Sequence, residues 1–175
     1  MLKQLLDRVP RLIDDLEGKG VQYTNVMPAR ADLDSGQGRS WQNTLGSKSK
    51  ASAERRLREL DYTWEWLQGE NLKVTTPVLT ATRLLADGRK VFFNQLIAAY
   101  RGWKDSRNKD SKKIQFGDGS DISEESMEVV CEIAENITYD HFWQKGDLLL
   151  VDNFLVMHGR RPFVGTRKVL ASLSI

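Results

Sequence analysis

Short strand-like segments separated by turns recur along the chain, and this pattern limits the folds that the chain can adopt. Tyr62, Trp64 and Trp66 alternate with polar residues, which is the two-residue period of a β-strand. Further strand-like segments span residues 21–27, 72–79, 81–85, 90–94, 148–151 and 169–175, and those at 72–79 and 81–85 are rich in Thr, Val and Leu. Asp87-Gly88 and Asp118-Gly119 are turn signals. Many short strands with few long helices predict an antiparallel sandwich or a barrel-like fold.

Three other segments predict helices. In residues 2–16, Leu, Ile and Val recur at three- and four-residue steps, and Pro10 inside this segment predicts a break. A second helix is expected over residues 52–60. A third is expected from Asp121, with Met127, Val130 and Cys131 on its apolar face. The position of Cys131 on this face indicates a buried packing residue rather than a nucleophile.

Composition excludes several classes of function. The 175 residues carry 26 Lys and Arg against 24 Asp and Glu, which predicts neither a general nucleic-acid surface nor a membrane-binding surface. One cluster of basic residues is most simply interpreted as the solvent-exposed start of a helix rather than a nucleic-acid patch. It comprises Lys48, Lys50, Arg55, Arg56 and Arg58. The single cysteine excludes an internal disulfide and a cysteine-based zinc site. We therefore expect one cytoplasmic domain over residues 1–175.

Only two histidines, His141 and His158, are available for catalysis or metal binding. Dinucleotide- and phosphate-binding glycine motifs, the Gly-x-Ser-x-Gly elbow and the His-Glu-x-x-His zinc motif are all missing from the sequence. The most informative segment spans residues 146–167. There a turn precedes an apolar run expected to be a buried strand, Asp152-Asn153 ends the run, and a loop leads to His158. Taken alone, His158 is more simply a hydrogen-bonded loop histidine than a metal ligand.

The combination of features in this segment resembles the clavaminate synthase-like branch of the taurine dioxygenase superfamily. These are iron(II)- and 2-oxoglutarate-dependent dioxygenases. In that branch a Gly-Asp-hydrophobic run leads to Asp-Asn, a metal-binding His, Arg-x-Pro-Phe and a basic pair. Matching pieces cover nearly the whole chain in the same order: Gly20-Val-Gln-Tyr23, Trp41 with Thr44, Val91-Phe-Phe-Asn-Gln95, Ala98-Ala-Tyr-Arg-Gly-Trp103 and Phe116-Gly-Asp-Gly119.

The resemblance implies the C-terminal part of a double-stranded β-helix (jelly roll), mainly β with flanking helices. It also implies Fe(II) and 2-oxoglutarate as cofactors and a small-molecule substrate. His158 would be the metal ligand. Arg167 would bind the distal carboxylate of 2-oxoglutarate, with Lys168 as the competing candidate if the strand register is shifted by one. Further residues could line the pocket or brace the loop: Asn94, Asn153, Arg160 and Arg161.

One expected part of the iron site is absent from the sequence. The family binds iron by two histidines and a carboxylate, and its first ligands form a His-x-Asp or His-x-Glu pair. No histidine precedes His141, whose surroundings lack this spacing. The chain is therefore expected either to lack the N-terminal half of an enzyme or to be a truncated, non-catalytic jelly-roll module that binds another chain or itself. A Ser or Cys hydrolase using His158 has little support, because no nucleophile motif is present.

Overall fold

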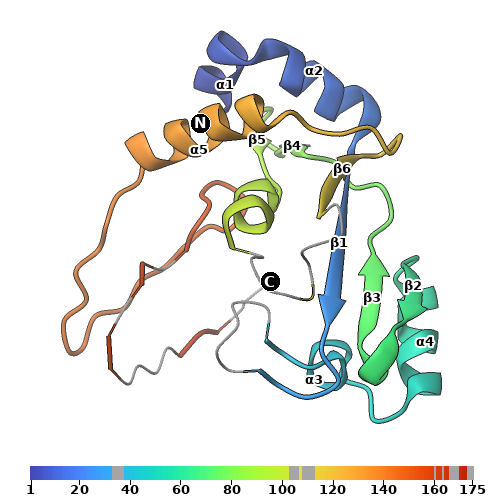
Figure 1. The fold of residues 1–175 in the computed structure, drawn as a ribbon. Helices are drawn as coiled ribbons and strands as arrows, with labels where there is room; N and C mark the ends of the chain where they lie inside the picture. Colours follow the sequence, from blue (N-terminus) through green and yellow to red (C-terminus); the bar gives the residue numbers. More distant parts are fainter. Residues whose placement is uncertain are drawn as a thin grey trace.

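The computed structural model describes residues 1–32, 38–102, 107, 113–159, 161–162, 164–165 and 170–172. Figure 1 shows its helices and strands in space. In chain order the elements are α1 (Leu2–Arg8), α2 (Pro10–Lys19), β1 (Val21–Met27), α3 (Trp41–Leu45), α4 (Lys50–Glu59), β2 (Thr63–Trp66), η1 (Gln68–Glu70), β3 (Leu72–Thr75), β4 (Thr82–Leu84), β5 (Lys90–Phe92), the π-helix η2 (Ala98–Gly102), β6 (Ile114–Phe116) and α5 (Glu124–Asn136).

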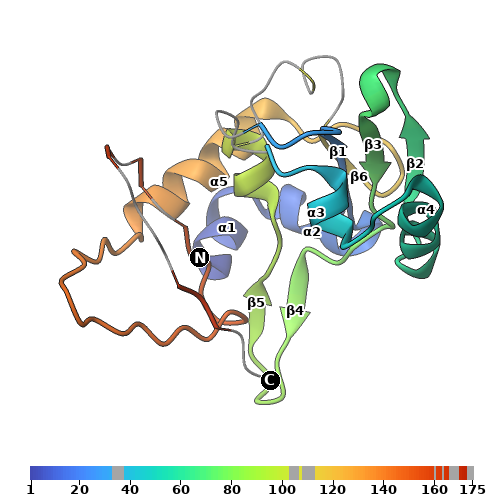
Figure 2. The same cartoon turned by 90° about the horizontal axis from the view of Figure 1, so that it is seen from below.

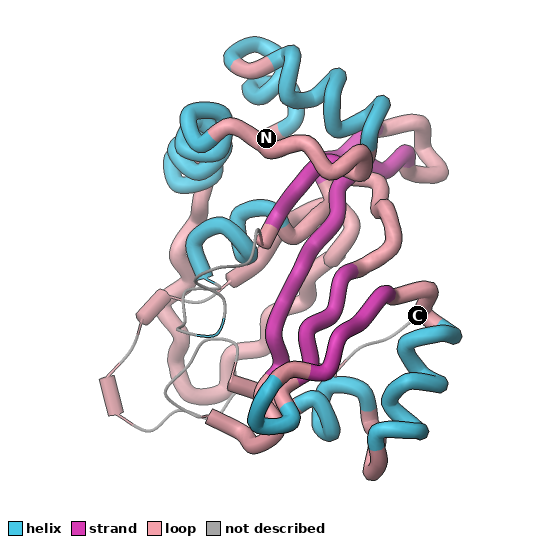
Figure 3. The backbone as a smooth tube through the Cα atoms, turned by 45° about the vertical axis from the view of Figure 1, so that its right-hand side comes forward, coloured by secondary structure: helices cyan, strands magenta, loops and turns pink. Residues whose placement is uncertain are grey.

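The strands form a four-stranded antiparallel sheet of order β2-β3-β1-β6 and a separate β4–β5 hairpin. β1 is the long central strand. Its C-terminal half pairs with β3, where Met27 lies opposite Leu72, and its N-terminal half pairs with β6, where Val21 lies opposite Phe116. Figure 3 shows helices grouped at both ends of this sheet, and Figure 1 identifies them as α1, α2 and α5 at one end and α3 and α4 at the other.

Two hydrophobic clusters follow from this arrangement. Leu5, Ile13 and Leu16 of the first two helices are buried in the larger cluster together with Val130 of α5. As the sequence predicts, the first helix is broken, and Pro10 occupies the first turn of α2, where its missing N–H leaves no hydrogen bond unmade. Cys131 is fully buried, which confirms its interpretation as a packing residue. The smaller cluster joins the far end of β1 to α3, α4 and β3; its members are Met27, Trp41, Ala53, Leu57, Leu72 and Val74.

Two glycines allow α2, β1 and the segment after β6 to approach closely. Gly20 ends α2 with a positive φ of 71°, a conformation that favours glycine, and its carbonyl accepts a hydrogen bond from the Gly117 amide at 3.2 Å. A Cβ on Gly117 would lie 2.2 Å from the Lys19 carbonyl oxygen and 2.5 Å from Val78 Cγ1. Both glycines belong to the motifs quoted above, so these motifs have structural roles here.

The structure matches the predicted fold class in part and corrects two sequence predictions. Flanking helices and antiparallel sheets are present, but helices and sheets are mixed and the described residues close no barrel. The buried strand predicted at residues 148–151 is wrong: Leu148 is 96% and Leu150 93% exposed, because none of the described backbone pairs with this run. The helix predicted from Asp121 begins later, with Ser123 as the capping residue. Among the described helices, none has the length and apolarity needed to cross a bilayer.

Burial of Tyr23 predicts a loss of stability at high pH. Tyr23 is 4% exposed, its hydroxyl accepts a hydrogen bond from the Gln95 amide at 3.0 Å, and burial raises its pKa to about 12. Above about pH 10 the unfolded chain releases the phenolic proton while the folded chain keeps it. The free energy of unfolding should therefore fall by about 1.4 kcal/mol per pH unit between about 10 and 12. Urea unfolding of the protein and of Tyr23→Phe measures this term, and an equal slope in both proteins would contradict it.

Candidate functional site

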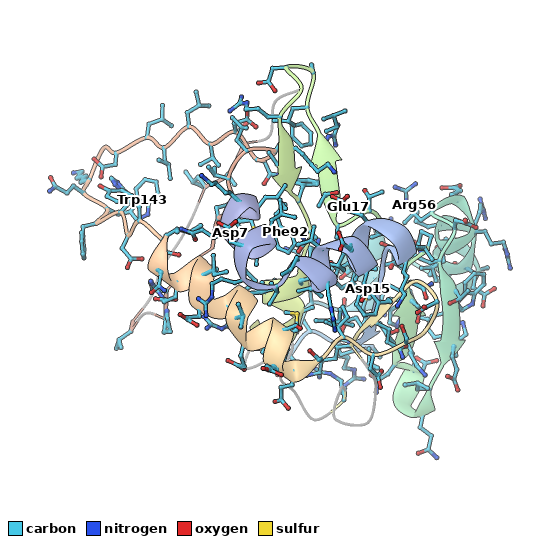
Figure 4. All side chains as sticks on the ribbon, turned by 90° about the horizontal axis from the view of Figure 1, so that it is seen from above. Asp7, Asp15, Glu17, Arg56, Phe92 and Trp143 are labelled. Carbon is cyan, nitrogen blue, oxygen red and sulfur yellow. The ribbon has the colours of Figure 1, made fainter. Side chains whose placement is uncertain are left out.

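The candidate site lies in the C-terminal arm, which we define as residues 137–172. The described part of this arm contains turns but no helix or strand. Figures 1 and 2 show it leaving the end of α5, extending away from the rest of the protein and returning to the β4–β5 hairpin. Figure 4 shows Trp143 at the outer part of the arm, far from Phe92 in the core. The arm carries both histidines of the sequence.

A turn over residues 152–155 holds the arm against the hairpin. Asp152 begins it, because its carboxylate accepts hydrogen bonds from the amides of Phe154 at 2.9 Å and Leu155 at 3.3 Å. The Phe154 ring packs on Phe93, just after β5, with 5.4 Å between ring centroids, and the Arg83 guanidinium of β4 lies 4.1 Å from the Phe154 centroid. Asn153, a predicted pocket or bracing residue, is exposed within this turn.

His158 lies three residues after the end of this turn and is exposed. An iron site of the implied type needs three protein ligands. Among the described residues, no group of three His, Cys, Asp or Glu side chains is close enough to hold a metal ion. The described side chains of this chain therefore do not fit such an ion by themselves.

His141 has a separate local role. Its Nε2 lies 3.0 Å from the Asp147 carboxylate, and its ring meets Trp143 edge-on with 4.9 Å between centroids. The same carboxylate accepts a hydrogen bond from the Gln144 amide at 2.8 Å. This amide and His141 hold the pKa of Asp147 below its usual value. These contacts close a local loop within the arm.

Arg161 joins the arm to the end of α5. Its Nε and Nη2 donate to the two carboxylate oxygens of Asp140 at 2.9 and 3.1 Å, and Nη2 also lies 2.7 Å from Glu135 Oε1. Glu135 is further paired with Arg101 at 3.6 Å. The hydrogen bonds to Arg161 lower the pKa values of Asp140 and Glu135 and raise that of Arg161. Asp140, Glu135 and Arg161 therefore remain ionised at neutral pH, and Arg161 is placed to brace the arm.

Asn94, the other predicted pocket residue, connects the hairpin to the chain that follows it. Its Nδ2 donates to the Ala81 carbonyl at 2.9 Å, and its Oδ1 accepts from the Leu96 amide at 3.0 Å. Both polar atoms of the half-buried amide group thus have backbone partners. The remaining predicted positions Arg160, Arg167 and Lys168 lie outside the described residues, as does Trp103 of the quoted motif.

Replacing Asn94 tests whether this amide has a structural or a chemical role. Asn94→Ala leaves two backbone groups without these partners, and we expect it to lower the free energy of unfolding by about 1–3 kcal/mol. Asn43→Ala is the matched control, because Asn43 is exposed on α3. Urea unfolding should show a clear loss of stability for Asn94→Ala and almost none for Asn43→Ala. If Asn94→Ala leaves the free energy of unfolding unchanged, the structural role is excluded and the pocket role is favoured.

Sequence reasoning missed the partners that fix the arm. Arg83 and Glu135 lie in separate elements, 71 and 26 residues before the arm residues Phe154 and Arg161 that they contact. A partial signal existed for Arg83: the Asp87-Gly88 turn sets the hairpin register, in which Thr82 lies opposite Phe92 and Arg83 opposite Val91. No comparable signal locates Glu135, because a salt bridge between distant residues leaves no sequence pattern.

Comparisons with known proteins place the arm inside a recognised family region. The model of the family described as "Taurine catabolism dioxygenase TauD, TfdA family" matches residues 3–173. A clavaminate synthase-like protein of Arabidopsis thaliana is 36% identical over 172 residues, which cover 98% of this chain and 52% of that protein. The dapdiamide synthesis protein DdaC of Enterobacter agglomerans is 29% identical over 183 residues, covering 95% of this chain and 54% of that protein. The chain thus spans about half the length of these relatives.

Proposed function

Because this chain belongs to the TauD/TfdA dioxygenase family, we propose that it forms part of an iron(II)- and 2-oxoglutarate-dependent oxygenase that acts on a small molecule. The observation that carries the proposal is the family match over residues 3–173, which includes the whole turn-to-His158 segment. Iron and 2-oxoglutarate would supply the oxidising chemistry, and the protein would bind and orient them. His158 is proposed as one iron ligand, since imidazole suits iron.

The other ligands are proposed to come from a polypeptide that corresponds to the unmatched half of the relatives. Two observations support this division. The described residues hold no three-ligand cluster, and the chain covers 52% and 54% of the two relatives. The arm also has apolar side chains free to be covered, since Leu148 and Leu150 are almost fully exposed. Burial of such side chains provides about 25 cal/mol per Å² of apolar surface removed from water.

The second candidate function is a non-catalytic module that binds another chain or a second copy of itself. The same exposed run favours it, because apolar side chains beside a backbone that pairs with none of the described residues promote pairing with another strand. The two candidates differ in whether an iron site is ever completed, and a spectroscopic titration separates them.

Anaerobic titration with iron(II) and 2-oxoglutarate tests the proposal. It compares this chain with the protein extended to the length of its relatives. Chelation of iron by 2-oxoglutarate in a completed site gives a metal-to-ligand charge-transfer band, which we expect from the extended protein. This chain alone should give little or none, because His158 is its one proposed iron ligand and the site needs three. An extended protein that folds but shows no band would overturn the oxygenase proposal and support the binding module.

The proposed 2-oxoglutarate anchor gives a second measurable effect. Arg167 would hold the distal carboxylate with two parallel hydrogen bonds. Loss of such a charge-assisted pair costs about 2–5 kcal/mol at partly buried sites. In the extended protein, Arg167→Gln should raise the 2-oxoglutarate concentration that half-saturates the band by more than about tenfold. Lys168→Gln is the control, and if it alone has this effect, the anchor is Lys168.

A further inference from the structure

His158 lies between two points at which the arm contacts the rest of the protein. Four residues before it, Phe154 packs on Phe93 beneath the Arg83 guanidinium. Three residues after it, Arg161 binds Glu135 at the end of α5. Between these points His158 itself is exposed. The two contacts involve different elements, the β4–β5 hairpin and α5, so together they restrict both the position and the direction of the short segment.

The first contact is aromatic and cationic. The Arg83 guanidinium lies 4.1 Å from the Phe154 centroid and 5.9 Å from that of Phe93, so one cation faces both rings. Such contacts are attractive because the ring face carries partial negative charge, and guanidinium groups stack well on rings. The Asp152 turn fixes the backbone of Phe154 at the same place. This contact therefore holds both a side chain and its backbone.

The second contact is an ion pair with well-defined geometry. Arg161 makes two parallel hydrogen bonds to Asp140 and a third interaction with Glu135. A bidentate pair fixes the plane of the guanidinium as well as its position. Asp140 lies where the arm leaves α5, so the pair also closes the loop of residues 140–161 at its base.

We infer that Phe154 and Arg161 are positioning residues that hold the His158 segment between the hairpin and α5 before any metal or partner binds. This inference rests on the proposed function only for the role of His158 as an iron ligand. Ordering the segment in advance would reduce the conformational entropy lost on metal binding. Neither residue is expected to touch iron or 2-oxoglutarate.

Distances between two spin labels test this inference without any metal. Glu125→Cys on α5 and His158→Cys on the arm accept nitroxide labels, and electron–electron resonance gives the distribution of distances between them. The native Cys131 is fully buried and burial raises its thiol pKa, so it should label slowly. We expect a narrow distance distribution in the doubly labelled protein that carries no other substitution. Arg161→Gln and Phe154→Ala should each widen it about twofold or more, because the segment then keeps only one of these two contacts between described residues.

Matched controls separate positioning from general destabilisation. Arg8→Gln removes a bidentate pair between another arginine and α5, at 2.8 and 2.9 Å to Glu132, but this pair holds α1. Phe142→Ala removes an aromatic side chain that is 85% exposed on the same arm. Both should leave the distribution unchanged. Circular dichroism and the melting temperature confirm that α5 is folded in each protein, and Arg161→Lys, which keeps the charge but not the bidentate geometry, should give an intermediate width.

The salt dependence of the distance distribution provides an independent test. At about 1 M salt the screening length is about 3 Å, so the Arg161 contact should weaken and the Phe154 contact should persist. High salt should therefore widen the distribution most in Phe154→Ala. Unchanged widths in folded Arg161→Gln and Phe154→Ala would overturn the inference whether or not His158 binds iron. Conversely, absence of the charge-transfer band in the extended protein would overturn the proposed function and leave this result standing.

Discussion

Gly117→Ala is expected to destabilise the protein by about 3 kcal/mol or more, at the upper end of the usual cost of overpacking. The added Cβ would lie 2.2 Å from the Lys19 carbonyl oxygen, a backbone atom that ends α2. It would also lie 2.5 Å from Val78 Cγ1. The side chain of Val78 could rotate away, but the carbonyl moves only if α2 moves. Relief of the clash would therefore pull α2 away from β6 and disturb the larger hydrophobic cluster.

Gly18→Ala is the control for this substitution. Gly18 lies within α2, near the carbonyl that Gly117 approaches, and a Cβ there would meet nothing within 4 Å. Because alanine favours a helix over glycine by about 0.8–1 kcal/mol, Gly18→Ala should leave stability unchanged or raise it. Urea unfolding of the two variants should give changes of opposite sign. Equal changes would show that the packing at Gly117 tolerates a side chain, and the clash argument would be wrong.

Features set by neighbouring residues could be predicted from the sequence. Pro10 breaks the opening helix because its ring prevents the chain from continuing one helix through that point. The strand at residues 21–27 and the Asp87-Gly88 hairpin are both present, since apolar patterning and turn chemistry act within a few residues. The buried face of α5 likewise follows from the spacing of Met127, Val130 and Cys131.

Features that depend on distant partners could not be predicted in the same way. The run at residues 148–151 has the composition of a buried strand, yet a strand forms only where another backbone completes its hydrogen bonds. The described residues provide none, so Leu148 and Leu150 face solvent. The contacts of Phe154 with Arg83 and of Arg161 with Glu135 were missed for a related reason, because each joins elements that the sequence cannot place side by side.

Several motifs that carried the family resemblance have structural roles. Gly20 allows a close approach of backbones, Tyr23 accepts a hydrogen bond from Gln95, and the Trp41 indole donates to the Glu70 carbonyl at 3.1 Å. Such residues indicate the fold, and a fold alone does not define a chemical activity. The proposed activity therefore depends on His158 and on residues beyond these motifs.

His158→Ala is expected to abolish 2-oxoglutarate-dependent succinate production in the protein extended to the length of its relatives. Removing a metal ligand should lower turnover by more than about 100-fold, since loss of even an outer hydrogen-bond partner of a ligand typically costs 10–100-fold. The charge-transfer band should disappear with the activity. Because His158 is exposed, the substitution creates no cavity and the melting temperature should hardly change.

His141→Ala provides the matched control, because it removes the only other histidine of this chain from the same arm. His141 pairs with Asp147 and packs against Trp143, so its loss should loosen the outer loop. The segment that carries His158 is held separately by Phe154 and Arg161 and should keep its position. Succinate production should therefore survive His141→Ala and disappear in His158→Ala. Near-normal turnover in His158→Ala would remove this residue from the iron site, and loss of turnover only in His141→Ala would assign the ligand to His141.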